Sequence, residues 1–429
     1  MSVSVLSIII PVYNKFALTR ACLASLADAT RGEDIEVIVV DNASSDETFR
    51  LCPALGKALF GDRFLYLPQE QNRNFSGANN IGAGCARGED LFFLNNDTLA
   101  KDAFLPPLLD VLRTDTSLGA VGPLLLYPQK ASLAERVQHC GVVLSLQNQI
   151  AHLYEFFPST HPLVQKKRFL QVITGAALCM KKALYQAVGG FDEGFVNGFE
   201  DVELCARLTR MGLRQKVVPE SVIYHYGGQS PGRTQHEAQN AQRCFEKCGN
   251  TLTVDEAARY REDGYRVFLS DWLRVEARKC MPLPPEPTSP HALQELRKQV
   301  LSEPFWLAGA LYLARLEERF GLLRDAFESY VLASHFYPTP DVFIPFAAFL
   351  LRQKQYDALA SVQEALEAFV TEPASRLTHL RELADACEMA RERDLADQAR
   401  QMMQENASFF STTHALLRDI RIQAAEERL

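Results

Sequence analysis

Two short polar segments of this 429-residue chain combine carboxylates with amides in a way that suits nucleotide binding. Asp41 opens the run Asp41-Asn42-Ala-Ser-Ser-Asp46, where a carboxylate with small neighbours could accept hydrogen bonds from a nucleobase or a ribose. Asp97 closes the run Asn95-Asn96-Asp97, and its oxygens suit a hard divalent cation that bridges to a diphosphate. Both acids have a structural alternative, because a turn after a strand often carries a carboxylate.

His225 could complete such a site from another part of the chain. It follows a strand-like segment, 221–224, and its neutral imidazole could join Asp97 in a metal shell. The alternative is a hydrogen-bonded packing histidine.

The pair Glu200-Asp201 lies where a helix is expected to begin, because apolar residues at positions 202, 205, 208 and 211 form one helical stripe. At the mouth of a cleft, Asp201 could act as a general base that takes a proton from an attacking hydroxyl. Its other role would be to cap the helix, which stabilises a helix by about 0.5–2 kcal/mol. The two roles are compatible for these neighbours.

Five short apolar runs, partly β-branched, predict strands that are buried on both faces. They cover residues 7–12, 35–40, 64–67, 91–94 and 121–126. Between the first two runs, apolar residues from Leu18 to Leu26 recur at helical spacing and give a strand–helix–strand unit. We therefore expect an α/β domain with a mainly parallel sheet and a ligand site at the carboxyl ends of its strands, where the polar segments lie.

Composition and charge limit the class of protein and its partners. Hydrophobic residues make up 47% and charged residues 23% of the chain, as in ordinary globular proteins. The net charge of -8 argues against nucleic acid as the main partner. Apolar runs stay shorter than a membrane span, and the N-terminal run ends in Pro-Val-Tyr-Asn rather than a cleavage site. We expect a cytoplasmic protein whose membrane contact, if any, is peripheral at the inner face.

Ten scattered cysteines agree with a reducing compartment better than with a disulfide framework. The close pair Cys244 and Cys248 has no second Cys/His pair at zinc-finger spacing, so packed thiols are favoured over a structural zinc. The run Gly82-Ala-Gly84-Cys-Ala-Arg87 has Arg where a dinucleotide fingerprint needs its third Gly, and the sequence has no Walker A motif. A dehydrogenase or an ATPase is thereby disfavoured.

A proline-rich segment divides the chain. Residues 281–290 contain five prolines and predict a semi-rigid linker between a catalytic domain, 1–280, with a helical extension from about 235, and an all-helical domain, 291–429. Alanines at 314, 348 and 384, and at 326, 360 and 396, are 34 and 36 residues apart. With Tyr330, Ala333 and Pro338 they resemble about three tetratricopeptide repeats. A generic alanine-rich helical bundle is the alternative.

The ordered motifs of the first half resemble glycosyltransferase family 2, in particular its rhamnosyltransferase-like branch. They are Ser7-Ile-Ile-Ile-Pro-Val-Tyr-Asn14, the runs at Asp41 and Asn95, Asn72-Arg-Asn-Phe-Ser-Gly-Ala-Asn-Asn-Ile-Gly82, Gly189-Gly-Phe-Asp192, Glu200-Asp201 and His225. The resemblance spans roughly residues 4–235. It implies the GT-A fold, an inverting mechanism, and a UDP-, dTDP- or GDP-linked sugar donor bound with a divalent cation, Mg²⁺ or Mn²⁺.

The resemblance also implies roles for single residues. The donor-binding residues would be Pro11, Tyr13, Asn14, Asp41, Asn42, Asn74, Asn79, Asn80, Asn95, Asn96 and Asp97. Asp97 and His225 would hold the metal, and Asp201, beside Glu200, would be the base. The family's Asp-x-Asp element has an amide here at Asn95, so Asp97 would carry most of the charge that faces the metal.

These roles predict an enzyme that transfers a sugar from a nucleotide-diphosphate donor to a hydroxyl of a surface glycan, whether lipopolysaccharide, polysaccharide or glycoprotein. The acceptor hydroxyl would attack the anomeric carbon from the face opposite the leaving diphosphate while Asp201 removes its proton. The helical tail would present the acceptor or bind a partner protein. The alternative, prompted by Asn95, is a scaffold that has lost catalysis and whose repeats bind a partner.

Overall fold

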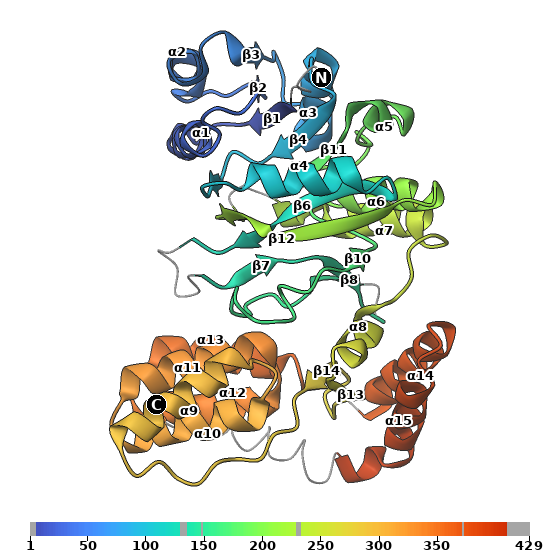
Figure 1. The fold of residues 1–429 in the computed structure, drawn as a ribbon. Helices are drawn as coiled ribbons and strands as arrows, with labels where there is room; N and C mark the ends of the chain where they lie inside the picture. Colours follow the sequence, from blue (N-terminus) through green and yellow to red (C-terminus); the bar gives the residue numbers. More distant parts are fainter. Residues whose placement is uncertain (1–5, 129–134, 147–148, 229–232, 371–372, 410–429) are drawn as a thin grey trace. The chain divides into compact units, whose positions relative to one another are not determined.

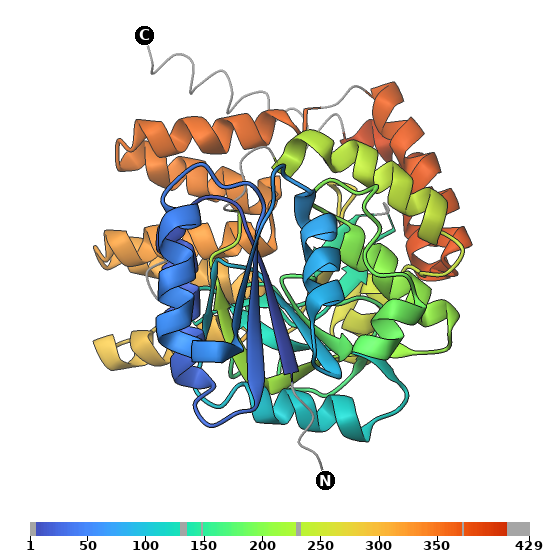
Figure 2. The same cartoon turned by 90° about the horizontal axis from the view of Figure 1, so that it is seen from above.

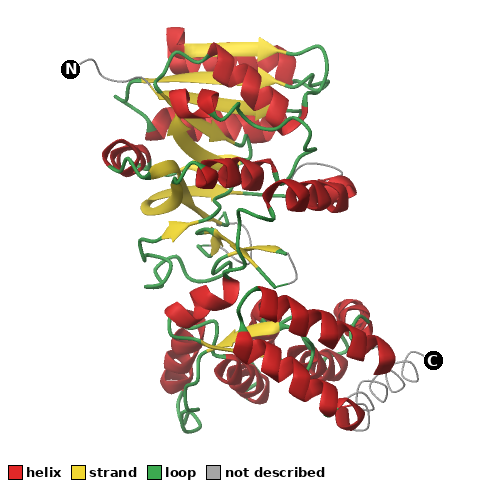
Figure 3. Ribbon diagram, turned by 90° about the vertical axis from the view of Figure 1, so that its right-hand side faces the viewer, coloured by secondary structure: helices red, strands yellow, loops and turns green. Residues whose placement is uncertain are grey.

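The structure, a computed structural model, describes residues 6–128, 135–146, 149–228, 233–370 and 373–409 (Figure 1). The chain forms two compact units. The first comprises Met1–Leu144 and Ile150–Thr253, and the second comprises Ser145–Gln149 and Val254–Leu429. Figure 3 shows that the large sheet belongs to the first unit, whereas the second is mainly helical.

The first unit is built on a sheet with the strand order β10-β12-β6-β11-β4-β1-β2-β3, to which β5 adds by pairing with β12 and β7 by pairing with β6. Its strands are β1 (Leu6–Val12), β2 (Ile35–Asp41), β3 (Phe64–Pro68), β4 (Asp90–Leu94), β5 (Thr98–Ala100), β6 (Leu118–Leu126), β7 (Val137–His139), β10 (Phe169–Leu170), β11 (Ala177–Lys181) and β12 (Arg214–His225). A separate ribbon consists of β8 (Val142–Leu144) and β9 (Ile150–His152).

The pairing confirms the expected α/β architecture and adds an antiparallel component. Strands β3, β2, β1 and β4 are mutually parallel neighbours, with Ile8 opposite Val37 and Phe92, and β6 and β12 form a second parallel pair. Between these two blocks, β11 runs antiparallel to both β4 and β6. All five strands expected from the apolar runs are present.

Helices cover both faces of this sheet. They are α1 (Phe16–Ala29), α2 (Thr48–Phe60), α3 (Asn74–Cys85), α4 (Leu105–Thr114), α5 (Lys182–Ala187), α6 (Glu200–Arg210) and α7 (Glu237–Cys248). Alternate residues of β1, such as Ile8, share one core with Leu23 of α1 and Leu108 of α4. On the opposite face, α3 approaches so closely that a Cβ at Gly82 would lie 2.5 Å from Cγ2 of Ile9. Figure 2 shows α1, dark blue, and α3, lighter blue, on opposite sides of the strands.

The second unit begins with a short helix and a hairpin and continues as helices. Its elements are α8 (Glu256–Glu262), β13 (Arg266–Leu269), β14 (Val275–Arg278), α9 (Pro290–Ser302), α10 (Leu307–Arg319), α11 (Leu323–Phe336), α12 (Pro340–Arg352), α13 (Tyr356–Glu367), α14 (Pro373–Met389) and α15 (Arg393–Gln404). Helix α10 packs on α11, α12 on α13, and α14 on α15.

The same turn joins the two helices in each of these three pairs. Gly321, Lys354 and Arg391 have positive φ angles of 76°, 55° and 62°. In each turn the N–H of the following residue donates to the carbonyl five positions earlier, the bond of a Schellman helix end. The three turns lie 33 and 37 residues apart, so the helical hairpin is repeated.

This spacing corrects the expected alignment of 34 and 36 residues. Counted from the turns, Ala314 is equivalent to Ala347 and Ala384, and all three are buried. Ala348, the residue aligned from the sequence, is exposed. Likewise, the residue equivalent to Ala326 and Ala396 is the buried Leu359 and not Ala360, which is half-buried. One residue turns a helical side chain by about 100°, which moves it off the packed face. The tetratricopeptide assignment itself stays a prediction.

The contacts also place residues 254–280 with the helices, whereas the sequence assigned them to the first domain. Tyr337 is the residue that follows α11. Its buried hydroxyl donates to the carbonyl of Ala277 in β14 at 2.8 Å and to the carbonyl of Phe305 at 3.0 Å. The N–H of Leu269 in β13 donates to Oε1 of Gln398 in α15. The division between the units therefore precedes the proline-rich segment.

Two further features bear on the sequence analysis. All ten cysteines are free thiols, and eight of them are buried. Within the described ranges, no helix is both long enough and apolar enough to cross a membrane.

Candidate active site

Two cavities meet at the carboxyl ends of the strands in the first unit. The strand-end cavity, about 350 Å³, is lined by residues that include Pro11, Tyr13, Asn14, Asn42, Asn96 and Asp97. The helix-end cavity, about 340 Å³, is lined by residues that include Gln138, Thr174, Glu200 and Asp201. Both are lined by Phe75, Asn95, Asn197, His225 and Gly228. The shared wall makes them two compartments of one cleft.

Asp97 and His225 face each other where the compartments join. His225 ends β12 and pairs with Thr98 of β5, which brings its ring beside the residue before Thr98. His225 Nε2 lies 3.1 Å from Asp97 Oδ1, and their side chains are only 10% and 8% exposed. The N···O distance is short, and Nε2 has no hydrogen-bond partner among the described residues.

The charge of Asp97 is set by its surroundings. Burial by itself would raise the pKa of the Asp97 carboxyl, but His225, when its ring is protonated toward Asp97, and the nearby backbone N–H groups outweigh burial and lower the pKa below its usual value. Asp97 is therefore a carboxylate at neutral pH. It stands beside a buried imidazole nitrogen in a cleft.

These atoms fit a divalent cation. Adjacent ligands of an octahedral ion, each at about 2.1 Å, lie about 3 Å apart, close to the observed N···O separation. Asn95 Oδ1, in the same wall, is also buried and lacks a hydrogen-bond partner in the described part of the chain. The described residues contain no group of three or more His, Cys, Asp and Glu side chains that could hold a metal. Ligand oxygens and water would have to supply the remaining positions.

The strand-end cavity is closed on one side by a bridge between the ends of β1 and β2. Asn14 Oδ1 accepts from the N–H groups of Ser45 and Asp46, and Ser44 Oγ accepts from the N–H of Asn14. Asn42 similarly binds the N–H of Arg73 and the carbonyl of Asn74 with its amide. These amides hold the loops that form the wall.

The helix-end cavity receives the first residues of α6. Gly175 N–H and Val202 N–H donate to the two oxygens of Asp201 at 2.7 and 2.9 Å, and Gly198 N–H donates to Glu200 at 2.6 Å. The residues before the helix, Asn197 to Phe199, all have positive φ. Strain of this kind costs about 1–3 kcal/mol for a non-glycine residue and is concentrated at functional sites. The expected helix start at the Glu200-Asp201 pair is confirmed.

Two of the expected donor residues, Asp41 and Asn74, are absent from the lining of both cavities. Asp41 is 1% exposed, accepts from the N–H of Ser44 at 2.8 Å and also binds the hydroxyl of Tyr66. It closes the strand with a turn, which was the structural alternative. Asn74 has a positive φ of 55°, and its carbonyl accepts from Asn42.

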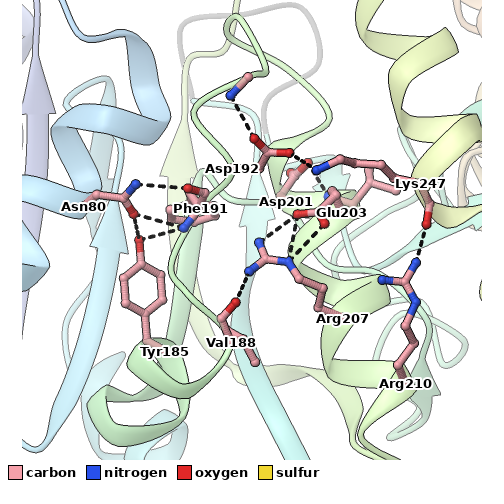
Figure 4. Close-up of polar contacts among 12 residues, drawn as sticks. Asn80, Tyr185, Val188, Phe191, Asp192, Asp201, Glu203, Arg207, Arg210 and Lys247 are labelled. Carbon is pink, nitrogen blue, oxygen red and sulfur yellow. Dashed lines mark hydrogen bonds and ion pairs between the residues drawn. The ribbon is translucent and has the colours of Figure 1, made fainter.

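Asn79 and Asn80, expected in the donor pocket, also lie away from it. Asn79 is fully buried and donates to the carbonyl of Phe75 one turn back in α3. Asn80 binds both the N–H and the carbonyl of Phe191 and accepts from the Tyr185 hydroxyl (Figure 4). These amide contacts hold the segment around Gly189-Gly-Phe-Asp192.

Several cleft residues escaped the sequence analysis. Phe75 and Asn197 belong to the shared wall, and the N–H of Phe75 donates to Asn197 Oδ1 at 3.1 Å. Gln138 and His139 come from β7 and line the helix-end cavity. Burial, followed by the charges of His152 and His225, lowers the pKa of His139 well below its usual value. The sequence signal for Asn197 was the Asn197-Gly198 pair just before the expected helix, because Asn and Gly favour the positive φ angles found there.

Comparisons with known proteins show what the first unit is similar to. Residues 7–186 match the family model described as Glycosyl transferase family 2. The chain is 33% identical over 229 residues to the O-antigen biosynthesis protein RfbC of Myxococcus xanthus, covering 51% of this chain and 17% of that protein. It is 25% identical over 250 residues to the N-acetylglucosaminyl-diphospho-decaprenol L-rhamnosyltransferase of Mycobacterium tuberculosis, covering 53% and 78%.

A validoxylamine A glucosyltransferase of Streptomyces hygroscopicus is 30% identical over 252 residues, covering 55% of this chain and 58% of that one. The crystal structure of GalNAc-T7 with UDP, GalNAc and Mn²⁺ superposes with a TM-score of 0.46 at 17% identity, over 57% of this chain and 48% of that one. The chain thus spans less than two thirds of several relatives that it matches. Residues 7–186 of this chain form a glycosyl transferase family 2 domain.

Proposed function

We propose that this chain is an inverting glycosyltransferase that moves a sugar from a nucleotide-diphosphate donor to a hydroxyl group of a surface glycan. The observation that carries the proposal is the divided cleft. Asp97 and His225 stand in its strand-end compartment, Asp201 stands in its helix-end compartment, and a common wall joins the two. A donor and an acceptor could therefore meet at that wall.

The strand-end cavity would hold the donor. Pro11 and Tyr13 at the end of β1 offer a surface for a nucleobase, and Asn42 and Asn96 lie in the same lining. The diphosphate would lie toward Asp97 and His225. A divalent cation bound there would neutralise the charge that develops on the leaving nucleotide diphosphate.

The helix-end cavity would hold the acceptor. Asp201 is fixed by two backbone N–H groups, and a carboxylate offers about four lone-pair sites, so these contacts are compatible with accepting a proton from a hydroxyl. Attack from this compartment reaches the anomeric carbon from the side opposite the leaving group, which inverts the configuration. Glu200 is bound to the N–H of Gly198 and helps to hold the turn before Asp201.

The relatives suggest the kind of acceptor. Proteins named for O-antigen biosynthesis and for rhamnosyl transfer to a decaprenol-linked sugar support a surface glycan as the acceptor. Its assembly would take place in the cytoplasm, with peripheral contact at the membrane. The helical hairpins of the second unit would present the acceptor or bind a partner protein.

Asn95 favours a second candidate, a glycosyltransferase-like scaffold with weak or no catalysis. An amide oxygen replaces a carboxylate in the wall of the cleft and removes one negative charge that a cation would meet. Such a protein would act through its helical hairpins.

A turnover assay separates the two candidates. The full chain is incubated with UDP-, dTDP- and GDP-linked sugars, with Mn²⁺ or Mg²⁺, and the release of nucleotide diphosphate is measured with and without glycan acceptors. An enzyme releases the nucleotide from at least one donor, and NMR of the product shows an inverted anomeric centre. A retained configuration would overturn the inverting mechanism, and no release from any donor would favour the scaffold.

A further inference from the structure

Gln138 holds the ring of His225 at two points. Gln138 Oε1 lies 2.6 Å from His225 Nδ1, and Gln138 Nε2 donates to the backbone carbonyl of His225 at 3.0 Å. Gln138 is 8% exposed and comes from β7, 87 positions away in the chain. The contact lies at the side of the imidazole that faces away from Asp97.

The two contacts fix the direction of the hydrogen bond between the side chains. A backbone carbonyl can only accept, so it must face the NH₂ group of the Gln138 amide. The amide oxygen is then left facing Nδ1, and because that oxygen also can only accept, Nδ1 must carry the proton. A flipped amide would set oxygen against oxygen at the carbonyl.

The neighbouring histidine does not compete for this contact. His139 Nδ1 lies 2.9 Å from His152 Nδ1, and His139 Nε2 accepts from the N–H of Thr174 at 3.3 Å. Both ring nitrogens of His139 are thereby engaged elsewhere.

We propose that Gln138 is a positioning residue that keeps the proton of His225 on Nδ1 and so presents the Nε2 lone pair, beside Asp97, to a divalent cation. The identity of the cation rests on the proposed function. The proton position rests only on the contacts of the amide. With the proton on Nδ1, Nε2 and Asp97 Oδ1 are two acceptors 3.1 Å apart, and a cation between them satisfies both.

The first test needs no metal and no substrate. Side-chain ¹⁵N NMR of histidine-labelled full chain, at about pH 8.5, roughly two units above the usual pKa of histidine, reports which nitrogen of His225 carries the proton. The wild type should show a protonated Nδ1. In Gln138→Leu the ring is released, and its proton should move to Nε2, where Asp97 can accept it. Gln138→Glu keeps an acceptor at Nδ1 and should retain the wild-type tautomer, although it loses the bond to the His225 carbonyl, so it tests the proton position alone.

The matched control is Gln171→Leu. Like Gln138, Gln171 makes two hydrogen bonds to one residue, because its amide binds both the N–H and the carbonyl of Thr253. It makes no hydrogen bond to His225. This variant should leave the His225 signals unchanged. The inference would be overturned if His225 in Gln138→Leu kept its proton on Nδ1. It would also be overturned if His225 in the wild type carried its proton on Nε2 and none on Nδ1.

The second test measures Mn²⁺ affinity by electron paramagnetic resonance. Gln138→Leu should weaken binding by about 10–100-fold, whereas Gln171→Leu should stay close to the wild type. Equal affinity in Gln138→Leu and wild type would contradict the positioning role. If the wild type itself binds no Mn²⁺, the metal part of the proposed function fails, and the metal-free NMR comparison still decides the role of Gln138.

Discussion

Two buried polar centres of this chain, one in each unit, are bonded in opposite ways. In the second unit, Tyr337 is only 2% exposed, and its hydroxyl donates to the carbonyls of Ala277 and Phe305. These bonds connect the β13–β14 hairpin to the helices. In the first unit, His225 Nε2 and Asn95 Oδ1 are also buried but face a cleft without a hydrogen-bond partner in the described ranges.

This difference separates structure from chemistry. A buried polar group that is fully bonded stabilises the fold, and removing its partner costs about 1–3 kcal/mol. A buried polar group that is left open costs stability and is explained by a ligand that completes it. Variants at groups of the first kind should therefore change mainly stability, and variants at groups of the second kind should change mainly function.

The largest effect is expected for Asp201→Asn. An amide cannot accept the proton of the acceptor hydroxyl, so kcat should fall by about 10²–10⁴-fold. Because the new NH₂ group can accept from neither Gly175 N–H nor Val202 N–H, a stability loss of about 1–3 kcal/mol is expected too, and kcat is measured well below the melting temperature. Steady-state kinetics with the active donor measure the effect. Asp28→Asn, on an exposed part of α1, serves as the control and should retain wild-type turnover. Unchanged turnover in Asp201→Asn would remove it as the base.

Tyr337→Phe should affect stability alone. It removes the hydroxyl that serves two buried carbonyls and should lower the unfolding free energy of the second unit by about 2 kcal/mol. Chemical denaturation measures this loss, and donor turnover should be unchanged. Tyr356→Phe is the control, because Tyr356 is 48% exposed, and it should leave the unfolding free energy unchanged. A loss of turnover in Tyr337→Phe would contradict the view that fully bonded buried polar groups affect stability and not function.

Asp192 is a closed polar centre within the first unit. Burial would raise the pKa of its carboxyl, but Lys247, the N–H of Gly194 and Arg243 hold that pKa at about 2 (Figure 4). A depressed pKa adds stability above the unfolded value of about 3.9, and this is lost as the pH falls toward 2. Asp192→Asn should therefore cost on the order of 2 kcal/mol at pH 7 and almost nothing near pH 2. A penalty that does not depend on pH would contradict this assignment.

The smallest effect tests the repeated turn. Lys354 holds a positive φ of 55° at the position that Gly321 occupies in the preceding hairpin. Lys354→Gly should stabilise the second unit by about 0.5–1 kcal/mol, and Gly321→Ala should destabilise it by a similar amount, because a side chain is strained in this conformation. Thermal denaturation compares the two variants. Effects of the same sign would show that the turns are not equivalent.

The sequence was sufficient for the elements that carry continuous patterns. Uninterrupted apolar runs predicted five strands, and the polar residues after them, such as Asn42 and Asp97, do meet at one edge of the sheet. The antiparallel insertion of β11 between β4 and β6 could not be predicted, because its residues have the same apolar pattern as a parallel strand.

Side-chain direction was the harder problem. Asn80 and Asn96 are both amides in recognisable motifs, but Asn80 is turned to the backbone of Phe191, and only Asn96 lines the cleft. Their surroundings come from segments more than 75 residues away, which a local pattern does not contain. Gln138 could not be identified from the sequence for the same reason, because its proposed role depends on contact with His225, 87 positions away.

The most direct measurement is the melting temperature of the protein with nucleotide-diphosphate sugars and Mn²⁺. A ligand that binds the native state raises this temperature. The wild type should show a rise that requires both Mn²⁺ and the matching nucleotide, and Asp97→Asn should lose it, because the cation then meets no carboxylate in the strand-end cavity. An equal rise in Asp97→Asn, or no rise with UDP-, dTDP- or GDP-linked sugars, would contradict the assignment of the donor site.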